Sequence, residues 1–135
     1  MAVKFFFKKE RSSVLGVIHR PVAKVQFWSK KGKYWLDIWM IVDTGADYTL
    51  LPRFLANDLQ IDLEKDCKIF STTGIGGQER VYFLSCIKVR IGKWEGKVPI
   101  GFLDRDEVPP LLGRHKFIEK FDTLFSKKHF VQFDI

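Results

Sequence analysis

Short strand-like runs at close intervals, separated by turns that contain glycine, are the feature of this sequence that most limits its fold. Residues 14–28 are rich in β-branched and aromatic side chains, and residues 33–42 resume the pattern after the turn at 29–32. Residues 81–91 end in a clear alternation of apolar and basic side chains, and residues 97–103 follow another glycine-bearing turn. Such spacing is typical of an all-β barrel or closed sheet rather than of βαβ units.

Two further segments have the periodicity of short helices. Residues 53–60 follow Pro52 and place apolar side chains at helical spacing, and proline is favoured at the first position of a helix. Residues 114–124 repeat an apolar side chain at intervals of four and three residues, which predicts a second, amphipathic helix. Residues 129–135 alternate between apolar and polar side chains and predict a terminal strand. The expected fold class is therefore all-β with one or two short helices.

The length and composition indicate one globular domain. The chain has 135 residues, of which 46% are hydrophobic, and it includes 13 phenylalanines and 4 tryptophans. A chain of this length buries about two-thirds of the surface that its unfolded form exposes, so a single core is expected. We expect residues 14–135 to form this domain and residues 1–13 to form a peripheral N-terminal arm.

The net charge of +7 permits attraction to nucleic acid, anionic membranes or acidic peptides. The lysines are scattered rather than gathered on one predicted face, and the aromatic residues carry no nucleic-acid-binding signature, so we expect no nucleic-acid partner. No apolar stretch approaches the roughly 20 residues of a membrane span. The first residues also lack the apolar stretch of a secretory signal. We therefore expect no membrane span and a cytoplasmic location.

The cysteines and histidines are too dispersed to suggest a metal site. Cys67 and Cys86 form no Cys-x-x-Cys pair, and the three histidines are scattered along the chain. We expect neither a metal nor another cofactor. In a reducing compartment the two cysteines are expected to be small core residues.

An acidic residue at the end of an apolar run is the candidate for chemistry. The stretch Ile41–Pro52 reads IVDTGADYTLLP, and Asp43 stands where a buried strand is expected to end, two residues before Gly45. On its own, the tripeptide Asp43-Thr44-Gly45 is also typical of a turn in which aspartate accepts a backbone N–H and glycine takes positive φ. The motifs elsewhere in the chain bear on the choice between a turn and a catalytic carboxylate.

Three motifs, in order and at similar separations, resemble those of the retropepsins, the retroviral-type aspartic proteases. They are the Asp-Thr-Gly segment at 41–47, the glycine-rich segment at 74–77 (GIGG) and the segment at 111–114 (LLGR). The resemblance covers about residues 14–135. It implies a closed retropepsin-type β-barrel with a β-hairpin flap, and it implies aspartic endopeptidase activity.

The resemblance also implies a homodimer. Retropepsins place one catalytic aspartate on each subunit, and this chain has a single Asp-Thr-Gly, because the later Asp122-Thr123 is followed by Leu124. Two adjacent carboxylates that share a proton can activate water with one group and protonate the peptide carbonyl with the other. We therefore expect two copies of Asp43 to meet at a two-fold axis and to hydrolyse a polypeptide bound in an extended conformation.

Further site residues follow from the family positions that they match. Thr44 matches a residue whose hydroxyl hydrogen-bonds across the dimer axis, and Gly45 lets the backbone approach the carboxylates. Ala46 and Asp47 match the residues that hold the main chain of the substrate. Arg114 matches an arginine that forms an ion pair with the second acid, so a structural ion pair between Asp47 and Arg114 is expected; a solvated arginine at a helix start is the alternative.

The glycine-rich tip and the cleft supply the remaining candidates. Ile75 and Gly76 match flap residues whose backbone N–H groups contact the substrate through a water, although an ordinary hairpin turn has the same composition. Apolar candidates for the substrate pockets, which are ordinary core residues in the alternative interpretation, are Ile75, Leu103, Val108, Pro109 and Leu111.

A non-catalytic module is the main alternative function. The same barrel could bind a peptide or serve for dimerisation, because a fold alone does not establish activity. The intact Asp43, Thr44 and Gly45 favour the enzyme. His115 replaces the Asn or Asp that is common in retroviral enzymes, and the tail is longer than theirs, so the part that the termini play in the dimer stays open.

Overall fold

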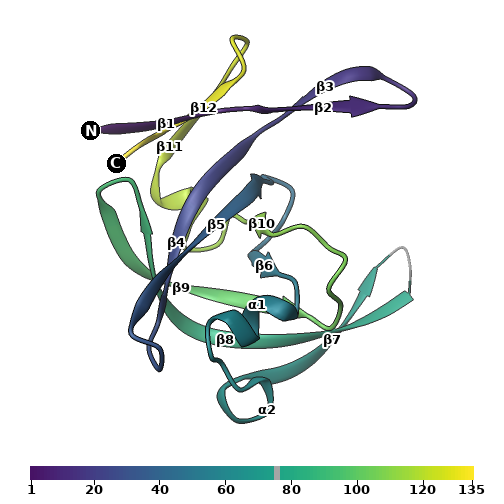
Figure 1. Ribbon diagram of the computed structural model, residues 1–135, viewed down its shortest axis with the longest axis vertical. Coiled ribbons are helices and arrows are strands. Elements are labelled where there is room, and N and C mark those ends of the chain that lie inside the picture. Colours follow the sequence, from purple (N-terminus) through teal and green to yellow (C-terminus); the bar gives the residue numbers. More distant parts are fainter. Residues whose placement is uncertain (75–76) are drawn as a thin grey trace.

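The chain folds almost entirely into β-strands (Figure 1). The computed structural model describes residues 1–74 and 77–135. Its strands are β1 (Ala2–Phe6), β2 (Lys8–Ser12), β3 (Gly16–Arg20), β4 (Val22–Ser29), β5 (Tyr34–Val42), β6 (Thr49–Leu51), β7 (Lys68–Gly74), β8 (Gly77–Ile91), β9 (Trp94–Leu103), β10 (Leu111–Leu112), β11 (Asp122–Ser126) and β12 (Phe130–Asp134). The helices in the same residues are short: α1 (Phe54–Asp58), α2 (Leu63–Asp66) and the 3₁₀ helix η1 (Ile118–Lys120). The predicted all-β class with few short helices is confirmed.

The largest sheet forms the body of the molecule. Its strand order is β4-β5-β10-β6-β9-β8-β7, and β4 pairs additionally with β8. Most neighbours are antiparallel, but β10 runs parallel to β5, and β6 runs parallel to β9. A second sheet has the order β1-β12-β11, and β2 pairs with β3 in a two-stranded sheet. The parallel pairing places the ends of β5 and β10 side by side, directly before Asp43.

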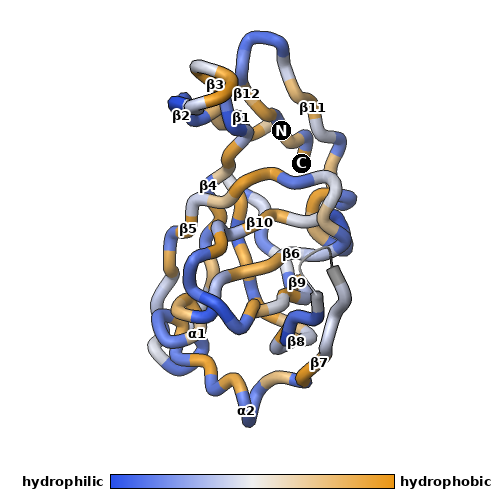
Figure 2. The backbone as a smooth tube through the Cα atoms, turned by 90° about the vertical axis from the view of Figure 1, so that its right-hand side faces the viewer, coloured by the Kyte–Doolittle hydropathy of each residue, from blue (hydrophilic) through white to orange (hydrophobic). Residues whose placement is uncertain are grey.

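Alternation along the strands of the large sheet builds the core. Every second side chain of β4 is buried, while Lys24 on the opposite face is exposed. Hydrophobic residues recur along the strands of this sheet in Figure 2. The largest fully buried side chains are those of Phe27, Met40, Leu51, Leu59, Ile91, Ile100, Phe102, Leu112, Phe117 and Phe133.

The two ends of the chain lie together in the β1-β12-β11 sheet (Figure 1). Strand β1 pairs along its whole length with β12, and the N–H of Ile135 donates to the carbonyl of Met1 at 2.7 Å. Phe133 of β12 is fully buried, and its ring packs edge-on against those of Phe5 and Phe121. Residues 1–13 thus form β1 and β2, and the predicted terminal strand is present as β12.

Proline divides the strand that was expected over residues 14–28. The segment forms β3 and β4, and Pro21 between them has no N–H to donate to a ladder. Its carbonyl instead accepts the N–H of Val42, the last residue of β5, at 2.9 Å. The helix expected over residues 53–60 is present as α1.

The prediction of a helix over residues 114–124 is wrong. This segment contains the short helix η1 and then continues as β11. Pairing of β11 with β12 supplies its backbone groups with partners from another strand. Phe117 and Phe121 pack on Trp94, but the side chain of Leu124 is 52% exposed, so the three apolar residues do not form one buried helix face.

The prediction that both cysteines are core residues is wrong for Cys86. An irregularity between Leu84 and Ile87 interrupts the pairing of β8 with β9, and Cys86 within it is exposed. Cys67 is half-buried, and this burial, followed by the charge of nearby acidic side chains, raises the pKa of its thiol to about 11.

Two negative findings concern residues 1–74 and 77–135. Nowhere in these residues do three His, Cys, Asp or Glu side chains gather in a group that could hold a metal ion. None of their helices is long and apolar enough to cross a membrane.

Candidate active site

Asp43 lies directly beyond the end of β5, beside β10. Its N–H donates to the carbonyl of Leu112 at 3.0 Å, which continues the parallel pairing of Val42 with Leu112 by one residue. The N–H of Val42 is in turn bound by the carbonyl of Pro21. Backbone groups from two other segments therefore fix the point at which the loop with the carboxylate begins.

The residues after Asp43 form a tight turn around its carboxylate. The N–H of Gly45 donates to Oδ1 of Asp43 at 2.9 Å, and the N–H of Ala46 donates to the Asp43 carbonyl at 3.2 Å. A Cβ at position 45 would lie 3.3 Å from the same Oδ1, so glycine suits this close approach. Asp43 is half-buried, whereas Thr44 and Gly45 are exposed. The turn thus holds a carboxylate in a fixed orientation at an open surface.

A second loop, at residues 113–115, supports this turn from behind. The N–H of Arg114 donates to the carbonyl of Ala46 at 3.0 Å, and the N–H of His115 donates to the carbonyl of Asp47 at 2.7 Å. Because these bonds join backbone to backbone, the two loops keep one relative position whatever their exposed side chains do.

Gly113 also packs tightly against Tyr48 and Thr49. The N–H of Gly113 donates to the hydroxyl of Thr49 at 3.1 Å, and the Thr49 side chain is fully buried. A Cβ on Gly113 would lie 2.3 Å from the carbonyl carbon and oxygen of Tyr48, closer than real atoms approach. Only glycine fits here without a backbone shift, so the contact explains the glycine of the LLGR segment.

Asp47 and Arg114 are brought together at the surface. Nη2 of Arg114 lies 2.6 Å from Oδ1 of Asp47, and the side chains are 48% and 83% exposed respectively. At such exposure an ion pair contributes at most about 1 kcal/mol to folding, because water screens the charges. The pair therefore contributes little to the stability of the fold.

A hollow of about 330 Å³ lies next to this ion pair. It is lined by Asp47, Tyr48, Phe83, Arg114, His115 and Glu119. Burial, and then the charge of Asp47, raises the pKa of the Tyr48 hydroxyl, so that this group stays protonated. The sequence analysis missed Tyr48, Phe83 and Glu119. Adjacency to Asp47 could have suggested Tyr48, but the other two come from distant segments without any local signal.

The hairpin of β7 and β8 extends from the body of the molecule (Figure 1). Its arms pair from Lys68 with Phe83 to Gly74 with Gly77. Ile75 and Gly76, the predicted flap residues, lie outside the described residues. Leu111, a predicted pocket residue, is half-buried in β10, where it pairs with Ile41 of β5 and Leu50 of β6.

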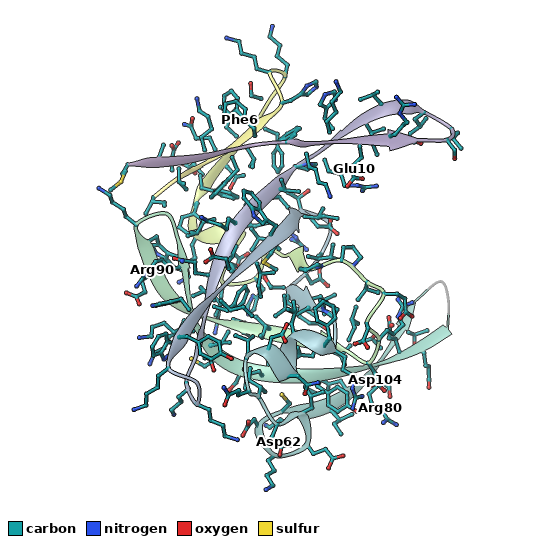
Figure 3. All side chains as sticks on the ribbon, in the orientation of Figure 1. Phe6, Glu10, Asp62, Arg80, Arg90 and Asp104 are labelled. Atoms are coloured by element: carbon teal, nitrogen blue, oxygen red, sulfur yellow. The ribbon has the colours of Figure 1, made fainter. Side chains whose placement is uncertain are left out.

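Contacts with the segment after β9 hold the β8 arm of this hairpin. The N–H of Asp104 donates to the carbonyl of Arg80 at 3.2 Å, and Figure 3 shows these two residues side by side. The guanidinium of Arg105 also lies 2.5 Å from the Glu79 carboxylate. Contacts with the segment after β9 therefore position the β7–β8 hairpin a few residues below its tip.

Comparison with known proteins identifies the family and the fold. A family model described as Aspartyl protease matches residues 31–115, which is more than half of the chain. No curated protein matches the sequence. The fold is similar to that in the crystal structure of a retropepsin-like aspartic protease from Rickettsia conorii, with a TM-score of 0.67, 21% sequence identity, and coverage of 96% of this chain and 98% of that chain. The chain therefore belongs to the aspartyl protease family and has a retropepsin-like fold.

Proposed function

We propose that this protein is an aspartic endopeptidase that acts as a homodimer, in which each copy supplies Asp43 to one catalytic dyad. The observation that carries the proposal is the Asp43 turn: a carboxylate fixed by backbone hydrogen bonds, next to the exposed Thr44 and Gly45. The chain has one Asp-Thr-Gly, so one copy holds half of a dyad. A two-fold interface supplies the other half from the same surface of a second copy.

The dyad hydrolyses a peptide bond without a covalent intermediate. One carboxylate takes a proton from a water molecule, and the water oxygen attacks the carbonyl carbon of the peptide. The other carboxyl group, which holds the shared proton, donates it to the carbonyl oxygen. The carboxyl group that took the proton from water then donates it to the nitrogen, the other carboxylate takes a proton from a hydroxyl of the tetrahedral intermediate, and the C–N bond breaks. The bond from Gly45 N–H to Asp43 keeps one oxygen oriented while protons move on the other.

The substrate binds as an extended strand between the site floor and the β7–β8 hairpin. Ala46 and Asp47 hold its main chain, and the Arg114 guanidinium keeps the Asp47 carboxylate in place. The hollow beside this pair is one side-chain pocket, and Leu111 contributes to another. The hairpin acts as the flap, and Ile75 and Gly76 are the residues predicted to contact the substrate. The extra pairing of β4 with β8 supports closure of the large sheet into a barrel below it.

Cleavage of a random peptide library tests the proposal. Wild type and Asp43→Asn are compared between about pH 4 and 7, where a carboxylate dyad can hold one proton. The matched control is Asp122→Asn, because Asp122 is also followed by threonine but is exposed in β11, away from the site loops. We expect cleavage by wild type and Asp122→Asn, and none by Asp43→Asn. A dimeric wild type that cleaves nothing would instead identify a non-catalytic binding module.

The dimer itself is tested by the dependence of activity on concentration. If each copy holds half of a dyad, the specific activity rises from nanomolar to micromolar chain as the dimer assembles. Equal specific activity down to concentrations at which sedimentation shows only monomer contradicts the shared dyad.

A further inference from the structure

We propose that the β2–β3 hairpin, residues 8–20, is an arm that binds the second copy in the proposed homodimer. This inference rests on the dimeric function proposed above. It assigns to the chain an interaction surface separate from the Asp43 loop, and the kind of partner that this surface takes is another copy of the same chain.

The hairpin projects from the molecule as a separate two-stranded sheet. Its strands pair with each other from Lys8 with Arg20 to Ser12 with Gly16, and no other described strand joins their ladder. Figure 1 shows it projecting from the body of the molecule. A two-stranded hairpin alone in water is marginally stable at best, and packing against another surface stabilises it. Binding to another protein surface would therefore stabilise this hairpin.

The tip of the hairpin is ordered and apolar. The hydroxyl of Ser12 accepts the N–H groups of Val14 and Leu15, and Gly16 takes the positive φ of +78° that closes the turn. The side chains of Val14 and Leu15 are nevertheless 87% and 73% exposed, and Val17 beside them is half exposed. Single exposed apolar residues are common, but three together on a projecting turn mark a contact surface.

The root of the hairpin is rigid. Glu10 and Arg20 form an ion pair across the two strands at 2.5 Å; Figure 3 labels Glu10 on the hairpin. The ring of His19 stacks on that of His129, in the turn between β11 and β12, with the ring centroids 3.8 Å apart. These contacts fix the direction in which the apolar tip points, so little conformational entropy is lost when it binds.

The position of the root favours a second copy as the occupant. Pro21, directly after the hairpin, holds the N–H of Val42, the residue before Asp43. The hairpin is therefore fixed to the strand whose end must face the partner copy in a shared dyad. In a two-fold interface each copy presents the same surfaces, so each hairpin lies on the other copy. Val14 and Leu15 of both copies, four side chains in all, are then removed from water.

The test measures dimerisation of a variant that makes the tip polar, Val14→Asp/Leu15→Asp. Because four tip side chains lose their burial in one dimer, we expect the dimer dissociation constant from sedimentation equilibrium to rise at least ~100-fold. The matched control is Phe54→Asp, since Phe54 is an exposed apolar residue on α1, outside the hairpin. It should leave the dissociation constant within about threefold of wild type.

A second measurement does not depend on a destabilising change. A photoreactive benzophenone side chain at position 15 should cross-link one copy to the other under the conditions in which wild type is dimeric. Peptide mapping of the cross-linked product then identifies the surface of the partner on which the tip lies.

The possible results distinguish a failure of the hairpin proposal from a failure of the proposed protease function. An unchanged dimer dissociation constant in the double variant, or no cross-link between copies, overturns the role of the hairpin and leaves the dyad proposal intact. If the double variant loses binding to mixed phosphatidylcholine and phosphatidylserine vesicles but still dimerises, the dimer role of the hairpin is overturned in favour of a membrane contact. A dimeric wild type that lacks peptidase activity refutes only the proposed function. Recovery of wild-type specific activity by the double variant at high concentration supports the hairpin as a dimer contact.

Discussion

Two threonines with buried hydroxyls allow the same substitution to be tested with opposite expected effects on stability. The hydroxyl of Thr49 accepts the N–H of Gly113 behind the Asp43 loop, whereas the buried hydroxyl of Thr123 in β11 has no hydrogen-bond partner among the described residues. Thr→Val replaces a hydroxyl by a methyl group of nearly the same size. Any difference between the two variants therefore reports on the hydrogen bond rather than on packing.

Thr49→Val is expected to lower the free energy of unfolding. The substitution leaves the Gly113 N–H buried without an acceptor, which costs about 1–3 kcal/mol. With a urea m-value of about 2 kcal/mol/M, the unfolding midpoint should fall by roughly 1 M. Thr49→Ser keeps the acceptor and loses only a methyl group, so it should lose about half as much stability. Peptide cleavage should also fall in Thr49→Val, because the loop behind Asp43 loses a support.

Thr123→Val is expected to leave stability unchanged or to raise it by up to about 1 kcal/mol, because a buried hydroxyl without a partner is costly. Urea unfolding of all variants at one protein concentration keeps the contribution of dimerisation comparable. The reasoning is refuted if Thr49→Val unfolds within about 0.2 M urea of wild type, or if Thr123→Val loses as much stability as Thr49→Val.

Four other outcomes follow from the structure. In the folded protein at about pH 8, iodoacetamide should alkylate the exposed Cys86 and spare Cys67, as peptide mass mapping will show, because the thiolate is the reactive form. Because burial raises the Cys67 pKa from 9.0 to about 11, the unfolded chain binds fewer protons between these values, and the free energy of unfolding should fall there with rising pH in wild type but less in Cys67→Ala. Gly113→Ala should reduce the yield of folded protein, measured by circular dichroism, because its Cβ meets backbone at 2.3 Å. Arg114→Gln should change the free energy of urea unfolding by less than about 1 kcal/mol, because its pair with Asp47 is exposed, yet it should raise KM for peptides.

Local patterns predicted the parts of the fold that depend on local chemistry. Alternation of apolar and polar side chains identified the strands that became β8 and β12, because a half-buried strand has this period wherever it pairs. The prediction of a helix over residues 114–124 was wrong because the structure there depends on a distant segment. Its spacing fits a helix, but a neighbouring strand offered β11 a ladder that no local pattern reveals.

The candidate site likewise contains residues that the local sequence predicts and residues that only the fold brings together. The turn that holds the carboxylate can be predicted from the sequence, because Asp43, Thr44 and Gly45 are contiguous. The hollow beside Asp47 is lined partly by Phe83 and Glu119, which come from β8 and η1 and meet only through the packing of the whole sheet. The exposure of Cys86 likewise depends on an irregular pairing between β8 and β9, which residue types alone do not specify.

The two-residue strand β10 has a consequence for when the Asp43 loop takes its final form during synthesis. It pairs with the end of β5 through Leu111 and Ile41, residues that lie 70 positions apart in the chain. Contacts of such separation close late in folding, because a long loop must first be ordered. A nascent chain emerges from its N-terminus, so Asp43 leaves the ribosome well before the segment that fixes it. The Asp43 carboxylate therefore acquires its final orientation only after residues 111–112 have been made and have paired with β5.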